Sequence, residues 1–358
     1  MRYEFWLGLR YLFAKRRERF ISIIAALSIG ALCAQAAEWE SVQTATFGGY
    51  GVSEKELSKA LEELKDPDPD VRIYRLAMLS NFHCREATCS QKPHDYAPDV
   101  LPLLGDPVPR VRAYALDALV QMGAREYLPD IVARLSDAEP GVRVHAIDAL
   151  QRFGAVEHAA SIAPLLKDDG VSLWEGEHVL VVKAAAIRAL GMLQARQYAD
   201  DIAPLLGNRV DVVRQMAVFV LAEMGDREHA SDIAVHLRDS NSLVRREAIL
   251  ALRKLEAREF SKEVAAALQD DAIAYQALAA LSDWNAIEHA ADVLLLLKPQ
   301  TAMPGIKKGT SLREAAVLTL GKFGAEPYTG EIRKLVTDND QGVREAAKKV
   351  LKELKKHR

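Results

Sequence analysis

The chain has 358 residues, of which 27% are charged and only 6% aromatic, and its net charge at pH 7 is −3. This length suits two ordinary domains or one long repeat array, and the abundant alanine and leucine suit helices packed through small side chains. The slightly acidic balance argues against a nucleic-acid-binding protein, which needs a basic surface to displace counterions.

The first 36 residues have the pattern of a secretory signal. Residues 1–19 are basic and amphipathic, residues 20–34 are apolar, and Ala34-Gln35-Ala36 forms a small-residue cleavage site, so we expect cleavage after Ala36. Cleavage would leave a chain of net charge −7, because six basic and two acidic residues would be removed. The alternative is an uncleaved membrane anchor, although the apolar run is short for a span of about 20 residues.

The same segment, FWLGLRYLFAKRRERFISIIAALSIG, resembles the amino terminus of the lipoprotein-releasing ABC transporter permease family. The resemblance covers about 30 of 358 residues, so it implies membrane targeting and says nothing of transport. That family keeps the segment as a membrane span. Cleavage and anchoring therefore both stay open, and either one places the rest of the chain in the periplasm or another extracytoplasmic compartment.

A short lead-in and a capping helix come next. Residues 37–52 are predicted to be a flexible lead-in because of Gly48, Gly49 and Gly51. Ser53 with Glu56 three residues later forms a capping box, which predicts a helix to Leu64 that closes one end of the following domain, residues 53–358.

A 31-residue repeat runs through residues 53–358. A basic residue heads each copy, a small residue follows three positions later, and a leucine usually follows at seven; the heads are Arg112, Arg143, Lys183, Arg214, Arg245, Arg313 and Arg344. Arg72 heads a first copy and Gln276 fills another head position. A fixed period of this size predicts an all-α solenoid of about nine two-helix repeats.

The turns between repeats carry a recognisable motif. Residues 106–112 (DPVPRVR), 66–72 (DPDPDVR) and 139–143 (EPGVR) resemble the HEAT-repeat family, in particular the HEAT-like repeats of phycobilisome lyases. This resemblance implies an armadillo-type superhelix with a ladder between the arginine and a turn aspartate of neighbouring repeats. Asn208, Gln276 and Lys307 depart from the pattern, so we expect the ladder to weaken towards the C-terminal half.

Glycines and prolines mark the helix ends. Gly123, Gly154, Gly225 and Gly324 each lie eleven residues after a head residue, where a helix C-terminus favours a positive φ. Pro164 and Pro204 fall inside the shorter helix of their repeats and should kink it.

Three insertions interrupt the period, at residues 81–98, 167–182 and 298–312. The second and third fall at equivalent junctions and should emerge on one edge of the solenoid, with the first on the opposite edge. Insertions on one edge often mark a binding side. The candidate partner-binding residues there are Leu173, Trp174, Met303 and Ile306. The alternative for Trp174 is that it folds back onto the array.

Two cysteines remain after residue 36, Cys84 and Cys89 in the first insertion, separated by four residues. In an oxidising compartment a local disulfide is expected. A metal site with His83, His94 or Asp95, or two free thiols, are the alternatives. The spacing matches no strong zinc signature, and we expect neither a metal nor a cofactor.

The shorter helix of each repeat carries a row of acids: Asp130, Asp201, Asp232, Glu263, Asp292 and Glu331. The HEAT resemblance implies that this helix lines the concave side, where an acidic ridge would attract a basic protein partner. The alternative is ordinary solvated helix charge. A row of rings and imidazoles three residues earlier, such as Tyr127 and His158, is expected to interlock the repeats.

These patterns predict a non-catalytic, extracytoplasmic scaffold that binds protein, contacts no nucleic acid, and touches the membrane only through residues 1–36. One alternative is a membrane-anchored structural subunit of an envelope complex. The other is a lyase- or hydroxylase-type HEAT-like enzyme or maturation factor. HEAT-like deoxyhypusine hydroxylases bind di-iron with adjacent His-Glu pairs, and the equivalent positions here, such as Ala113-Tyr114 and Arg246-Glu247, carry no such pair.

Overall fold

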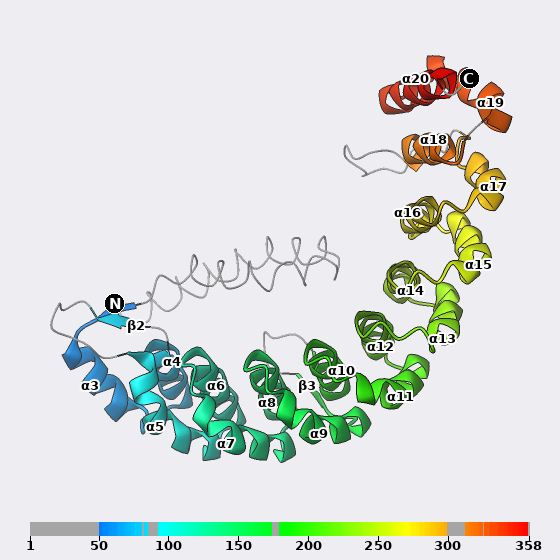
Figure 1. Cartoon of the computed structure of the whole chain (residues 1–358). Helices are drawn as coiled ribbons and strands as arrows, with labels where there is room; N and C mark the ends of the chain where they lie inside the picture. The colour runs from blue at the N-terminus through cyan, green and yellow to red at the C-terminus, as the bar shows by residue number, and fades with distance from the viewer. Residues whose placement is uncertain are drawn as a thin grey trace.

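The computed structural model describes residues 50–80, 82–84, 92–173, 179–298, 312–324 and 326–356. These residues form a curved solenoid of paired helices that rises from α3 at one end to α20 at the other (Figure 1). The all-α solenoid predicted from the 31-residue period is confirmed.

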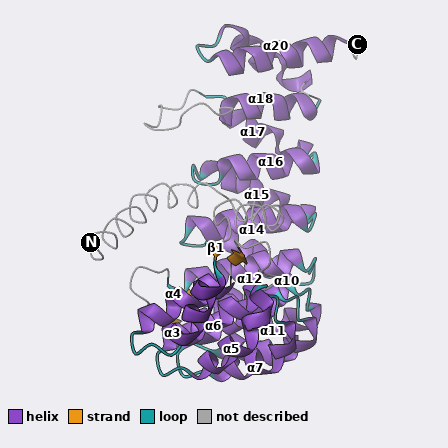
Figure 2. Ribbon diagram, turned by 90° about the vertical axis from the view of Figure 1, so that its left-hand side faces the viewer, coloured by secondary structure: helices purple, strands orange, loops and turns teal. Residues whose placement is uncertain are grey.

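One row of helices is long. It consists of α4 (Pro69–Ser80), α6 (Pro109–Gln121), α8 (Pro140–Arg152), α10 (Val182–Met192), α12 (Asp211–Glu223), α14 (Ser242–Lys254), α16 (Ala274–Trp284), α18 (Leu312–Lys322) and α20 (Gln341–Lys356). Each packs on the next member of the row, and Figure 2 shows α14, α16, α18 and α20 stacked one above another.

The second row is short. It consists of α3 (Glu54–Glu63), α5 (Ala97–Val100), α7 (Leu128–Ala133), α9 (Ala159–Ile162), α11 (Ala199–Ile202), α13 (Ala230–Val235), α15 (Ser261–Ala266), α17 (Ala290–Leu295) and α19 (Thr329–Lys334). The predicted capping box at the start of α3 is present, because Ser53 and Glu56 each accept a hydrogen bond from the other's backbone N–H.

The apolar and small residues that recur in each repeat are the residues buried between helices. In α6 the valine before Arg112, the alanine three residues after it and the leucine seven after it, Val111, Ala115 and Leu119, are all fully buried. These positions lie on one helical face, and the small alanine lets neighbouring helices approach closely. Each repeat therefore buries its apolar face only against its neighbours, as in other solenoids.

Proline determines where two of the short helices change from α-helical to 3-10 geometry. In α9 and α11 the α-helical part lasts four residues, and Pro164 and Pro204 then begin 3-10 turns at Ala163–Lys167 and Ala203–Gly207. Most short helices without an internal proline, such as α13 and α15, keep six α-helical residues. The predicted kink is thus an earlier change to 3-10 geometry, because proline offers no N–H to the α-helical ladder.

The predicted Arg–Asp ladder joins neighbouring repeats along one edge. Six arginines donate to an aspartate of the next repeat at 2.6 to 3.1 Å, in the pairs Arg72–Asp106, Arg112–Asp137, Arg143–Asp168, Arg214–Asp239, Arg245–Asp270 and Arg313–Asp338. Hydrogen bonding from Arg214 holds the pKa of Asp239 far below its usual range, and the same pair raises the pKa of Arg214. Both charges are thus kept ionised in a mostly buried setting.

The ladder is less complete in the C-terminal half, as predicted, because the head positions Lys183 and Gln276 do not carry an arginine. Three of the six pairs lie on each side of α10. One interruption lies at α10, where Lys183 pairs with Asp169 of its own repeat at 2.6 Å and Asn208 offers no carboxylate, and a second lies at the neutral Gln276. Asp270 keeps its arginine because the partner is Arg245 of the preceding repeat rather than the residue at position 276.

The expected orientation of the two rows is wrong. The long helices line the inner, concave side of the arc, and the short helices lie on its outer side (Figure 1). The sequence period separates buried from exposed positions within a helix, but it does not say which row faces inwards.

Two small pairs of strands decorate the array. β1 (Tyr50–Val52) pairs in parallel with β2 (Phe82–Cys84), so residues 50–52, expected to belong to a flexible lead-in, form a strand. β3 (Val171–Ser172) and β4 (Leu180–Val181) pair antiparallel, with Val171 opposite Val181. β2 follows the C-terminus of α4 and β4 precedes the N-terminus of α10, which places these parts of the first and second insertions at opposite edges, as predicted.

Candidate functional site

The second insertion presents exposed apolar side chains. Leu173, which follows β3, is 72% exposed, and Val171 and Val179 of the same hairpin are 47% and 59% exposed. Leu173 was expected to be a contact residue, and the structure shows it to be accessible. The two valines were missed, although the alternation of Val171, Ser172 and Leu173 is a strand signal in which two residues share a face.

The base of this hairpin is fixed to the repeat before it. The Ser172 hydroxyl, which is buried, donates to Glu139 Oε1 at 2.7 Å. Asp168 accepts from the Gly170 N–H at 2.7 Å and from Arg143 of the ladder at 2.7 Å. A Cβ at position 170 would collide with the Arg143 guanidinium, so glycine lets the chain turn tightly against the ladder. Hydrogen bonds to the preceding repeat therefore fix the part of the hairpin that carries the exposed apolar residues.

Two further exposed apolar residues lie at the same edge of the array. Val212 and Leu243, near the N-termini of α12 and α14, are 37% and 52% exposed. We call Val171, Leu173, Val179, Val212 and Leu243 the apolar edge. Single exposed apolar residues are common on soluble proteins, but a row of them beside a fixed hairpin is typical of an interaction site. The other candidates for this edge, Trp174, Met303 and Ile306, lie outside the described residues.

The acid row lies on the convex side rather than the concave side. Asp130, Asp201, Asp232, Glu263, Asp292 and Glu331 are all on short helices, and all but the half-buried Asp292 are exposed. Asp292 lies 3.3 Å from His289 Nδ1, and Glu331 pairs with Lys334 at 2.8 Å. The predicted acidic concave ridge is therefore wrong, and these charges form a solvated outer row, one acid to a repeat.

The rings that precede the acids interlock the repeats, as expected. Tyr127, Tyr198, Phe260 and Tyr328 are partly buried and pack against the core.

The concave side carries a different polar group, which the sequence did not indicate. His145 Nδ1 lies 3.0 Å from Asp117 Oδ2 of the preceding repeat, and Asp148 pairs with Arg188 of the following one. Loss of solvation raises the pKa of Asp148. These four residues connect α6, α8 and α10 across the inner face. Their common position in the repeat could have revealed them, because Asp117, Asp148 and Arg188 each lie five residues after a head residue.

No group of three or more His, Cys, Asp or Glu among the described residues is arranged to hold a metal ion. Likewise, within the described ranges no helix combines the length and the apolar character that crossing a bilayer requires. Cys84 is in β2 and Cys89 lies outside the described residues, so their disulfide stays a prediction.

The fold and its edge ladder define an α-solenoid built from short two-helix repeats. Residues 97–176 and 205–282 match the family profile of HEAT repeats, so the chain carries HEAT repeats, as the turn motifs predicted. No curated protein sequence matches the chain.

Comparison with solved structures finds similar chains at low sequence identity, of which YibA shares the fold. YibA of Escherichia coli is 16% identical with a TM-score of 0.52, over 76% of this chain and 99% of YibA. A chain from the structure of the CpcE–CpcF complex of phycocyanin lyase from Nostoc sp. PCC7120 is 18% identical with a TM-score of 0.40. The match covers 75% of this chain and 94% of the chain from the complex. Human deoxyhypusine hydroxylase is 17% identical with a TM-score of 0.32, and the match covers 85% of this chain and 97% of the hydroxylase chain.

Proposed function

We propose that this protein is a non-catalytic scaffold that binds a protein partner through the apolar edge. The observation that carries the proposal is the β3–β4 hairpin, which presents Val171, Leu173 and Val179 to solvent while Ser172 and Asp168 fix its base. Apolar side chains held in place lose little conformational freedom on binding, which favours them as anchors. HEAT repeats generally mediate protein binding, and this supports the same conclusion.

The partner should meet the hairpin and the neighbouring turns together. Val212 and Leu243 lie on the two long-row helices that follow α10, so a partner seated on the hairpin can extend across three repeats. The exposed acids on the short helices provide a field that attracts a basic partner, and this contribution should fall as salt rises.

We further propose that residues 1–36 direct the chain out of the cytoplasm, either as a cleaved signal or as an anchor that would make the protein a structural subunit of an envelope complex. The support is the sequence pattern of that segment. Intact mass after cell fractionation tests it. A chain that begins at Ala37, or a full chain in the membrane fraction, agrees with the proposal, and a full-length soluble cytoplasmic pool contradicts it.

The binding proposal is tested by affinity capture with the full chain, comparing wild type with Leu173→Ser and Val179→Ser. A partner enriched by wild type and lost with both variants supports the apolar edge. A matched control is Val235→Ser, because Val235 is 70% exposed but lies on α13 of the outer row. Equal loss with Val235→Ser, or equal enrichment by all variants, would show that the apolar edge is not the binding surface.

A further inference from the structure

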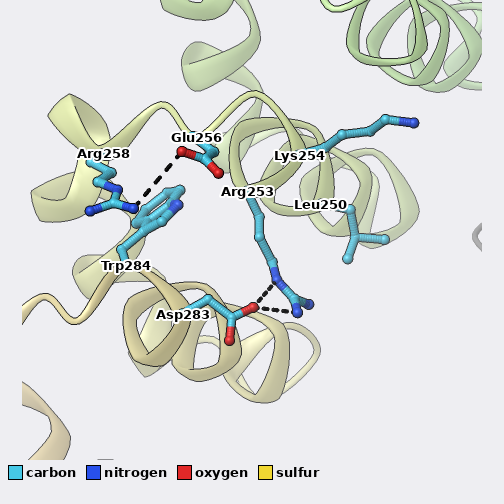
Figure 3. A pocket seen from close by; sticks show the side chains of 7 residues that line it. All are labelled: Leu250, Arg253, Lys254, Glu256, Arg258, Asp283 and Trp284. Carbon is cyan, nitrogen blue, oxygen red and sulfur yellow. Dashed lines mark hydrogen bonds and ion pairs between the residues drawn. The ribbon is translucent and has the colours of Figure 1, made fainter.

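A cavity of about 350 Å³ lies between the C-terminal ends of α14 and α16 (Figure 3). The hairpin precedes the N-terminus of a long helix, so the cavity is at the opposite edge of the array. Its walls include Trp284, Arg258, Arg253, Glu256 and Asp283. This volume is at the small end of the range of ligand pockets, so it suits one amino-acid side chain better than a large cofactor.

The cavity is lined by a buried hydrogen-bond donor that has no acceptor. Trp284 is only 5% exposed, and its indole Nε1–H has no hydrogen-bond partner among the described residues. In Figure 3 the indole nitrogen faces the space between Glu256 and Arg253. A buried indole N–H usually finds a partner, so this one is a donor available to a ligand.

Arg258 is a second available donor, and comparison with other repeats shows why. Arg125 and Arg227 occupy the same repeat position, thirteen residues after a head residue. Each donates to a backbone carbonyl of the next repeat and pairs with a glutamate there, Arg125 with Glu157 at 2.9 Å and Arg227 with Glu259 at 2.8 Å.

Arg258 has lost both of these contacts. Within the described part of the chain, the one polar contact of its side chain is with Glu256 at 3.9 Å, and the Arg258 side chain is 60% exposed. The guanidinium can therefore turn towards a ligand without breaking a strong pair.

The other cations of the cavity are already paired. Arg253 Nε donates to Asp283 at 2.6 Å, and Lys254 is bound to Glu223. The cavity thus offers two hydrogen-bond donors without a strong partner, the Trp284 indole and the charged Arg258 guanidinium. The complementary ligand is a negatively charged hydrogen-bond acceptor.

We propose that this cavity binds a carboxylate carried by an acidic peptide segment. The Arg258 guanidinium pairs with the carboxylate, the Trp284 indole N–H donates to it, and Leu250 with the indole ring covers the apolar stem. Because an arginine fork matches a planar carboxylate, this group fits better than a neutral carbonyl. The inference is independent of the apolar edge and holds whether or not the hairpin binds a partner.

The indole N–H itself is the reporter for the test. The full chain has four tryptophans, and Trp284→Phe assigns the Trp284 indole signal in a ¹⁵N–¹H spectrum. The probes are acetyl-Gly-Glu-Gly-amide, acetyl-Gly-Gly-Gly with a free carboxyl end, and acetyl-Gly-Gln-Gly-amide as the neutral control. We expect a saturable downfield shift with a carboxylate probe and none with the neutral one.

The two carboxylate probes distinguish the source of the ligand group. A response to the capped Glu peptide assigns a side-chain carboxylate, and a response confined to the free carboxyl end assigns a chain terminus; either supports the proposal. Arg258→Gln should weaken binding at least about fivefold, whereas the matched Arg227→Gln should leave it within about twofold.

Three outcomes would overturn the proposal. The first is no shift with either carboxylate probe at about 10 mM, well above a millimolar dissociation constant. The second is an equal shift with the Gln peptide, and the third is equal weakening by Arg227→Gln and Arg258→Gln. Circular dichroism melting of each variant confirms that the compared proteins are folded.

Discussion

Glu247 is expected to make the stability of the solenoid depend on pH between about 4.5 and 7. It lies on α14, is only 6% exposed, and burial raises its pKa to about 7 from the ordinary 4.5 despite the nearby Arg246 and a hydrogen bond with Gln215. Because the folded state favours the protonated form, the stability that Glu247 contributes is complete below pH 4.5 and is lost as the pH rises to about 7.

The size of this effect follows from the two pKa values. A shift of 2.5 units from 4.5 to about 7 corresponds to roughly 3 kcal/mol, since each unit is worth about 1.4 kcal/mol. The variant Glu247→Gln keeps the shape and the hydrogen-bonding capacity but cannot ionise. At pH 8 it should be more stable than wild type by on the order of 2–3 kcal/mol, and at pH 4.5 the two should be nearly equal.

Urea denaturation of both proteins at half-unit steps from pH 4.5 to 8 measures this difference. Other groups cancel in the comparison, including His229, whose pKa is raised, and Asp239, whose lowered pKa keeps it ionised throughout this range. The control is Glu345→Gln, an exposed glutamate of α20 that should change nothing. A stability difference between Glu247→Gln and wild type that does not grow with pH would refute the reasoning.

Three further predictions concern the ladder, the helix ends and the hairpin. Arg214→Met should lower the free energy of unfolding, measured in urea, by about 3–5 kcal/mol because it leaves the Asp239 carboxylate buried without its partner. Arg227→Met removes an exposed pair and should lower it by less than about 1 kcal/mol. Equal losses for the two variants would contradict the burial of the Arg214–Asp239 pair. Gln194 has a φ of 54° at a position where several other repeats have glycine. Gln194→Gly should therefore raise the free energy of unfolding by about 0.5–1 kcal/mol, and Gly154→Ala should lower it by about 1 kcal/mol. Changes of the opposite sign would show that backbone strain is not the cause. Leu173→Ser should change the melting temperature by less than about 2 °C, because a mostly exposed side chain contributes little to folding, and a larger drop would mean that Leu173 packs on the array rather than awaiting a partner.

Much of the repeat architecture could be predicted because each repeat obeys strong local rules. Val111, Ala115 and Leu119 reveal a buried helical face by spacing alone. Gly123, Gly154, Gly225 and Gly324 all have the predicted positive φ, between 61° and 77°. The ladder is implied by the resemblance of the turn motifs to HEAT repeats, and its interruption at Asn208 was predicted. Asp270 was wrongly expected to lack an arginine, because its partner is Arg245 of the preceding repeat.

The curvature and the candidate surfaces were harder to predict. Which row of helices lies inside depends on the packing between whole repeats, so Asp130 and its equivalents were placed on the wrong side of the arc. The strand at Tyr50–Val52 pairs with residues about thirty positions away and has no alternating pattern long enough to indicate it. The Trp284 cavity was not predicted because the absence of a strong pair at Arg258 becomes visible only when the repeats are compared in three dimensions.

Site-specific photo-cross-linking shows whether Leu173 lies in the interface with a partner. A photoreactive residue at position 173 is compared with one at position 235, since Leu173 and Val235 are almost equally exposed but lie on the apolar edge and on the outer row respectively. We expect one defined cross-linked partner from position 173 and none from position 235. The same partner from both positions, or no partner from position 173, would contradict a scaffold that binds through the apolar edge.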